Sequence, residues 1–141
     1  MNRQRGVALI EFALILPMVL ILTMITTEIG RAYHRYNTLA KSVREAARYL
    51  SVRAQGVDVP KAKNIIVYGN SAGTGQPVIP GLSLSNVPDP AWGKTGSYPV
   101  LNTVTVSVTG YTFVPMVGSV FGLNLGTITF GPIRATMRSP S

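Results

Sequence analysis

The chain has no cysteine, a single histidine and only five acidic side chains among its 141 residues. Without cysteine, no disulfide or thiolate zinc site can brace a small domain, and cysteine usage says nothing about the redox compartment. His34 and five scattered acids form no metal-ligand pattern. We therefore expect no metal and no cofactor, and a fold that depends on packing alone.

Charged side chains are absent from a long C-terminal stretch, Thr95 to Ile133, although the formal net charge is +8. Such a charge raises nucleic acid or anionic lipid as partners. However, ten of the thirteen Lys and Arg residues lie at or before Lys63, in a short leader and in one helical segment. Aromatic residues are not interleaved with them in the pattern of a nucleic-acid groove. The basic residues therefore predict a solvated helix face, and nucleic acid is disfavoured as a partner.

One apolar run dominates the N-terminal part, GVALIEFALILPMVLILTMITTEIG from Gly6 to Gly30. At about 1.5 Å per residue, Val7 to Ile29 covers roughly 33 to 35 Å as a helix, enough to cross a hydrocarbon core of about 30 Å. A secretory signal peptide is disfavoured because the run is longer than an ordinary apolar region and lacks a small-x-small cleavage site. We expect residues 7–29 to form a single transmembrane helix in a lipid bilayer.

Two residues interrupt that run. Glu11 would cost about 2.5 to 3.5 kcal/mol at a bilayer centre, so it either reaches the interface or has a function. Pro17 removes one backbone hydrogen bond, which predicts a kink near Ala13 to Pro17 or a tolerated transmembrane proline.

The start of the chain resembles the processing site of type IV prepilin-like proteins. Arg3 and Arg5 precede Gly6, and Glu11 stands at the fifth position after that glycine. The acid is followed by an aromatic residue, Phe12, a pattern similar to that of the Flp, or tight-adherence, branch of that superfamily. The resemblance implies that residues 1–6 are a basic leader, which a prepilin peptidase removes between Gly6 and Val7. It also assigns Glu11 and Phe12 to assembly and register.

Two later segments resemble the TadE-like family of minor pseudopilins. The first, Glu28-Ile29-Gly30-Arg31-Ala32, is similar to the family's acid-x-Gly-Arg step. The second, Arg44-Glu45-Ala46-Ala47-Arg48-Tyr49, is similar to its "REGARY"-type segment, with Ala46 where glycine is often found. The family positions implied are Glu28, Gly30, Arg31, Arg44, Glu45, Arg48 and Tyr49. The implied partners are the prepilin peptidase, other pilin-like subunits and the inner-membrane pilus assembly machinery.

The helix is predicted to continue over residues 30–55 as an amphipathic segment, ended by Gln55-Gly56 and Pro60. Its apolar side chains fall within an arc of roughly 120° at helical spacing. They are Tyr36, Leu39, Ala40, Val43, Ala46, Ala47 and Leu50.

Residues 56–141 are predicted to form a small β-rich head. The strand candidates are Asn64 to Tyr68, Val100 to Thr112 and, more weakly, Thr127 to Met137. Ser71 to Gly96 is rich in turn residues and predicts a long loop, with Trp92 held against the domain. The fold class is therefore α+β and pilin-like: a long N-terminal helix with a small antiparallel sheet packed on its C-terminal half.

The uncharged segment Tyr111 to Phe130 allows two interpretations. Gly118, Gly122 and Gly126 repeat at four-residue spacing, as on the packing face of a membrane helix. Pro115, the glycines and the β-favouring Thr-Ile-Thr-Phe favour a loop or short helix between strands, which we prefer.

No catalytic constellation emerges from the sequence. Gly69-Asn70-Ser71-Ala72-Gly73 matches the nucleophile-elbow pattern, but the only histidine lies upstream and the only later acid is Asp89. Gly93-Lys94-Thr95 lacks the first glycine of a phosphate-binding loop. We expect no catalytic residue and no enzyme.

Orientation is not decided by charge. A count of positive residues near the two ends of the run would place the head in the cytoplasm. The resemblance implies the opposite, because the leader must meet its peptidase there. We therefore expect a single-pass inner-membrane protein with a periplasmic head. Whether it enters the filament stays open.

The expected function is that of a minor pseudopilin that helps to initiate or prime a tight-adherence pilus. The alternatives are an unprocessed single-pass scaffold of a secretion or envelope complex and, resting on the basic helix face alone, a DNA-binding subunit of an uptake apparatus.

Overall fold

The computed structural model describes residues 2–120 and 122–140. They divide into two compact units. One unit contains the chain up to Tyr33 together with Val114–Thr127, and the other contains His34–Phe113 and the chain from Ile128 onward. Met1 of the predicted leader and Phe121 of the uncharged segment lie outside the described residues.

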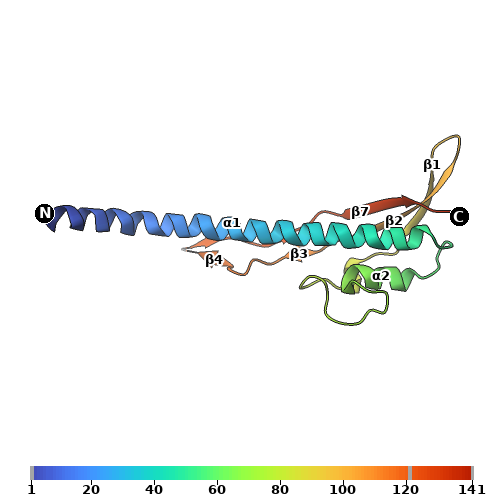
Figure 1. The fold of residues 1–141 in the computed structure, drawn as a ribbon, viewed down its shortest axis with the longest axis horizontal. Coiled ribbons are helices and arrows are strands. Elements are labelled where there is room, and N and C mark those ends of the chain that lie inside the picture. The colour runs from blue at the N-terminus through green and yellow to red at the C-terminus, as the bar shows by residue number, and fades with distance from the viewer. Residues whose placement is uncertain (1, 121, 141) are drawn as a thin grey trace. The chain divides into compact units, whose positions relative to one another are not determined.

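A single helix, α1, runs from Asn2 to Ser51 through Pro17 (Figure 1). The expected long N-terminal helix is therefore confirmed, and it ends four residues before the predicted Gln55. By length and composition, α1 can cross a membrane. Three threonines in its apolar half satisfy their own hydroxyl groups, each donating to the carbonyl four residues earlier at 2.8 Å. This pairing lowers the cost of placing those hydroxyls in lipid.

The core of the second unit contains the predicted helix stripe. Its members Leu39, Val43, Ala46, Ala47 and Leu50 are fully buried. Tyr36 departs from the prediction, since 44% of it is exposed, and its ring meets that of Phe130 edge to face at 5.8 Å. The periodicity of the sequence thus located the buried face of the helix.

Residues 64–68 are helical, so the predicted first strand is wrong. They end α2, which spans Val59–Tyr68 and has proline in its first turn. Its buried side chains are Ala62, Ile65, Ile66 and Val67, whose spacing is that of one helix face. Packing of this face outweighs the β propensity of Ile-Ile-Val-Tyr. Gly69, at φ +72°, ends the helix in the left-handed conformation.

A three-stranded antiparallel sheet confirms the expected α+β class. Its order is β1-β2-β7, formed by β1 (Ala91–Thr95), β2 (Leu101–Val108) and β7 (Ile133–Arg138) (Figure 1). In β2, Val104, Val106 and Val108 are buried and pair with Met137, Ala135 and Ile133 of β7. Thr105 and Ser107 between them face the other side, where Thr105 and Thr136 share a hydrogen bond of 2.7 Å. The alternation predicted from the sequence is therefore observed.

The predicted loop from Ser71 to Gly96 contains more structure than expected. It includes the short 3-10 helix η1 (Leu84–Asn86) and the whole of β1. Trp92 lies in β1 opposite Val104 and is half-buried, so it is held by strand pairing and not by a loop.

The segment 111–130 forms short strands where it is described. In the second unit, β3 (Thr112–Phe113) pairs with β6 (Ile128–Thr129). In the first unit, β4 (Ser119–Val120) pairs with β5 (Leu123–Asn124). The alternative of a second membrane helix is wrong, because α1 is the one helix of the described residues that is long and apolar enough to span. Glycines and Pro115 in this segment disfavour a helix.

Candidate functional site along the N-terminal helix

The predicted processing site lies in α1. Gly6 and Val7 are exposed, and a Cβ added at Gly6 would meet no atom within 4 Å. Folding of this chain therefore does not require glycine at position 6. A requirement for glycine there would come from a partner that reads the site.

Glu11 and Phe12 lie one turn further along α1, and both are exposed. Among the described side chains, the Glu11 carboxylate makes no ion pair or hydrogen bond, and its neighbours Ile10 and Leu14 are exposed apolar groups. Val7 precedes Glu11 by four residues, which places the two on the same helix face.

Glu28 is buried and holds together two parts of the first unit. One nitrogen of Arg31, Nη1, donates to both carboxylate oxygens, at 2.8 and 2.9 Å. The backbone N–H of Met116 donates to Oε1 of the same carboxylate at 3.1 Å. Only 8% of Glu28 is exposed. This acid therefore fixes the segment 114–127 to α1, a role that sequence reasoning did not find.

Gly30 stands between the two charged partners, and a Cβ there would also meet no atom within 4 Å. The glycine is thus not required by packing inside this chain. A bare backbone on an exposed helix face allows another helix to approach closely.

The segment Arg44 to Tyr49 divides by exposure. Arg44, Glu45 and Arg48 are exposed. Tyr49 is half-buried and donates its hydroxyl proton to Oδ2 of Asp58 at 3.4 Å. The tyrosine therefore has an internal partner, while the three charged positions face outward.

Asp58 is the centre of a small charged cluster that sequence reasoning missed. Lys61 Nζ lies 2.9 Å from Oδ1 of Asp58, and Arg53 Nε lies 3.3 Å from Oδ2. The hydrogen bond from Lys61 lowers the pKa of Asp58, and the same bond raises the pKa of Lys61. The guanidinium of Arg53 also lies 3.9 Å over the Tyr49 ring. The cluster joins the end of α1 to the start of α2. In the sequence, its one indication was the acid Asp58 just before Val59-Pro60.

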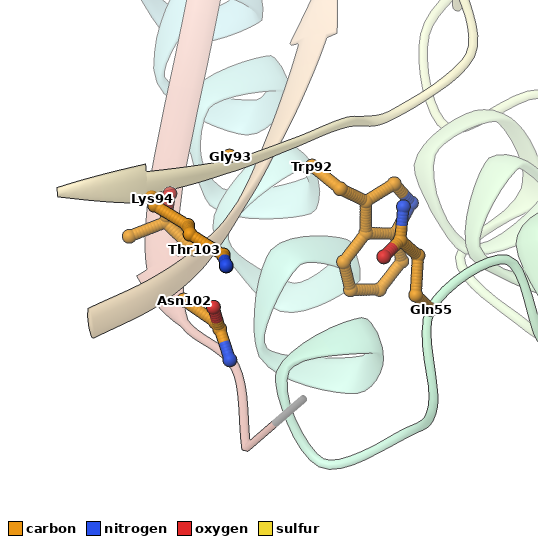
Figure 2. A pocket seen from close by; sticks show the side chains of 6 residues that line it. All are labelled: Gln55, Trp92, Gly93, Lys94, Asn102 and Thr103. Carbon is orange, nitrogen blue, oxygen red and sulfur yellow. The ribbon is translucent and has the colours of Figure 1, made fainter. Parts of the chain in front are cut away.

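One open hollow lies beside strands β1 and β2. The hollow drawn in Figure 2 is open, has a volume of about 170 Å³ and is lined by Gln55, Trp92, Gly93, Lys94, Asn102 and Thr103. Figure 2 shows Trp92 and Gln55 on one side of it, and Lys94 and Asn102 on the other. Lys94 is the only ionisable group among these residues.

Ser71 and His34 suggested catalysis in the sequence, and both are exposed in the structure. Ser71 is exposed in a turn after α2, whereas a nucleophile elbow follows a strand. His34 is exposed on α1. In the described part of the chain, no three His, Cys, Asp or Glu residues are grouped to hold a metal.

The comparison with known families identifies the N-terminal segment. Residues 6–48 match the model of the TadE-like protein family. This TadE-like segment begins at the predicted processing site and includes both motifs except Tyr49. The match confirms the resemblance and associates the segment with tight-adherence pilus systems. No curated protein and no solved structure matches the chain.

Proposed function

We propose that this protein is a minor pseudopilin of a tight-adherence pilus, made as an inner-membrane precursor with a periplasmic head. The observation that carries the proposal is the TadE-like match over residues 6–48, on a helix with the length and composition of a membrane anchor. It is cleaved before Val7 and then helps to initiate or prime the filament with other pilin-like subunits. It has no catalytic role.

The exposed carboxylate of Glu11 supplies the physical step. Cleavage before Val7 creates an ammonium group one helical turn from Glu11. That ammonium pairs with Glu11 of the same chain or of a neighbouring subunit. In hydrocarbon a pair is less costly than either charge alone, and an unpaired partner costs roughly 3 to 5 kcal/mol on the scale of buried pairs. Assembly of subunits is favoured by this pairing.

Two measurements on wild type and Glu11→Ala, at matched abundance, test the proposal. The first is the N-terminal sequence and intact mass of the protein recovered from membranes. The second is recovery of partner pseudopilins with it. Asp89→Ala is the matched control, because Asp89 lies in the head, where its side chain is 84% exposed and forms a surface ion pair with Lys63.

We expect a mature chain starting at Val7 in all three proteins, and loss of partner recovery in Glu11→Ala alone. Equal recovery of partners and normal pili in Glu11→Ala would show that the acid is merely tolerated. Full-length protein in cells with an active prepilin peptidase would favour an unprocessed scaffold.

A further inference from the structure

The segment 114–127 belongs to the same compact unit as the apolar half of α1. It is distant in sequence from that half, and it carries the β4–β5 hairpin. Leu125 closes it further, donating its N–H to the carbonyl of Gly118 at 3.1 Å. The two paired strands of the hairpin therefore belong with the apolar half of α1.

Glu28 determines where the hairpin segment attaches. Its buried carboxylate accepts the Met116 N–H and is held in turn by Arg31. A buried, charge-assisted hydrogen bond of this kind is stronger than one between neutral groups. The attachment point lies one residue before the end of the predicted span, residues 7–29.

Three large apolar side chains of this segment are exposed. The exposed fractions of Val114, Met116 and Leu123 are 60%, 76% and 52%. No Asp, Glu, Lys or Arg occurs from residue 114 to residue 127. An uncharged segment that exposes three large apolar side chains favours contact with something apolar.

The depth of the segment follows from its neighbours on α1. Met116 and Val117 line a groove of about 250 Å³ whose other lining residues, all on α1, are Thr23, Met24, Thr27, Glu28 and Arg31. A hydrocarbon core of about 30 Å accommodates roughly 20 helical residues, so its far boundary falls within the last turn of the predicted span, residues 7–29. The groove therefore lies at the last turn of the span, at the boundary between acyl chains and headgroups.

Backbone chemistry excludes a deeper position. Each strand of the hairpin has two residues, whereas a spanning strand needs about 9 to 11. The unpaired N–H and C=O groups of so short a ladder need water or headgroups as partners. The boundary supplies those partners on one side and acyl chains on the other.

We propose that the 114–127 segment is a lipid-contacting element, seated in the interfacial layer of the leaflet from which the head emerges, and that Glu28 positions it there. Its partner is the headgroup and upper acyl region of the bilayer. The proposal rests on α1 being a membrane anchor, and not on the role of the protein in a pilus.

The absence of cysteine makes a direct test possible. Leu123→Cys, Val19→Cys and Ser71→Cys are each labelled with an environment-sensitive fluorophore in the full chain. All three positions are exposed. Each protein is reconstituted at one copy per phosphatidylcholine–phosphatidylglycerol nanodisc, so that no second subunit can cover the segment. Quenching is compared for lipids spin-labelled near the headgroup, lipids spin-labelled near the acyl end and a water-soluble quencher.

We expect the Leu123 probe to be quenched most by the headgroup-proximal spin label, several-fold more than the Ser71 probe in the head. The Val19 probe should respond most to the acyl-end label. A Leu123 probe that responds to the soluble quencher as strongly as Ser71, or to neither lipid, would overturn the interfacial position. A Val19 probe insensitive to both lipids would overturn the anchor itself.

The role of Glu28 is tested with the Leu123 probe in two further variants. Glu28→Ala removes the acceptor of the Met116 N–H, so lipid quenching should fall toward the Ser71 value. Asp89→Ala should leave it unchanged, because Asp89 lies in the other unit. Quenching that is identical in Glu28→Ala and wild type would show that the acid does not position the segment.

Discussion

Arg35 and Tyr111, which are 76 positions apart in the chain, meet through a hydrogen bond of 3.3 Å from the guanidinium Nη1 to the phenol oxygen. The phenol in turn donates to the carbonyl of Pro80 at 3.0 Å. The Arg35 guanidinium also lies 4.8 Å above the ring of Phe113. This relationship connects α1, the loop before β1 and the end of the β2 region within the second unit.

Tyr111→Phe should destabilise that unit by about 1 to 3 kcal/mol, because it removes both hydrogen bonds of the phenol and leaves the Pro80 carbonyl without this donor. The measurement is hydrogen exchange of the detergent-solubilised full chain. Tyr98→Phe is the matched control, since Tyr98 is 98% exposed and should show no change. Equal protection in wild type and Tyr111→Phe would contradict the role assigned to the phenol.

Leu50→Ala should cost about 2 to 5 kcal/mol, the range for truncating a fully buried leucine. Leu50 has no exposed surface, whereas Val52, two residues on, is 74% exposed. Val52→Ala should therefore change stability by less than about 0.5 kcal/mol. Chemical denaturation of the full chain in detergent compares the stability of the two variants. Similar losses of stability would contradict the packing of Leu50 at the end of α1.

The ion pair between Asp58 and Lys61 should make stability depend on pH at both extremes. The pKa of Asp58 is lowered from its ordinary value of 3.8, so its contribution is present above that value and is lost as the pH falls through the lower, folded-state pKa. The pKa of Lys61 is raised from 10.5, so its contribution is present below that value and is lost at higher pH. We expect the stability difference between wild type and Asp58→Asn to be constant near neutrality and to vanish in acid. A difference that grows on acidification would contradict this sign.

Processing before Val7 should remove Arg3 and Arg5 and take the formal side-chain charge from +8 to +6. Gly6→Trp should block the cut without unfolding the chain, because the space around Gly6 is open. Gly30→Trp is a useful control for bulk in α1, as that glycine is also surrounded by open space. Intact mass spectrometry of membrane-derived protein decides between cut and uncut chains. Normal cleavage of Gly6→Trp would place the processing site elsewhere.

Ser71→Ala and His34→Ala should leave pilus formation unchanged, because both side chains are exposed and neither belongs to a catalytic group. Pilus counts at matched protein level provide the measurement. A strong loss in either variant would reopen the assignment of a non-enzymatic role.

Local patterns predicted the elements whose signal lies in one segment. Apolar length revealed α1, and strict alternation revealed β2, since each pattern follows directly from helix or strand geometry. The helix over 59–68 was missed because its Ile-Ile-Val-Tyr end favours a strand, and packing of Ile65 and Ile66 decided otherwise. Strand β1 was missed because its Ala-Trp-Gly-Lys-Thr sequence has no apolar alternation and depends on pairing with β2.

The candidate site shows the same division. The sequence motif placed Glu28 and Arg31 in the same acid-x-Gly-Arg segment. In the structure the two are i,i+3 neighbours that form an ion pair. The bond from Glu28 to Met116 spans 88 positions, and no local pattern carries such information. The cluster around Asp58 likewise depends on how α1 and α2 meet.

The order β1-β2-β7 leaves β1 and β7 as the two outer strands of the sheet. The three basic residues beyond Lys63 all lie on these strands: Lys94 on β1, and Arg134 and Arg138 on β7. All three are exposed. Positive charge on an open strand edge opposes its pairing with the same edge of another copy. Where two copies of the head meet, this charge disfavours a continuous ladder formed through these edges.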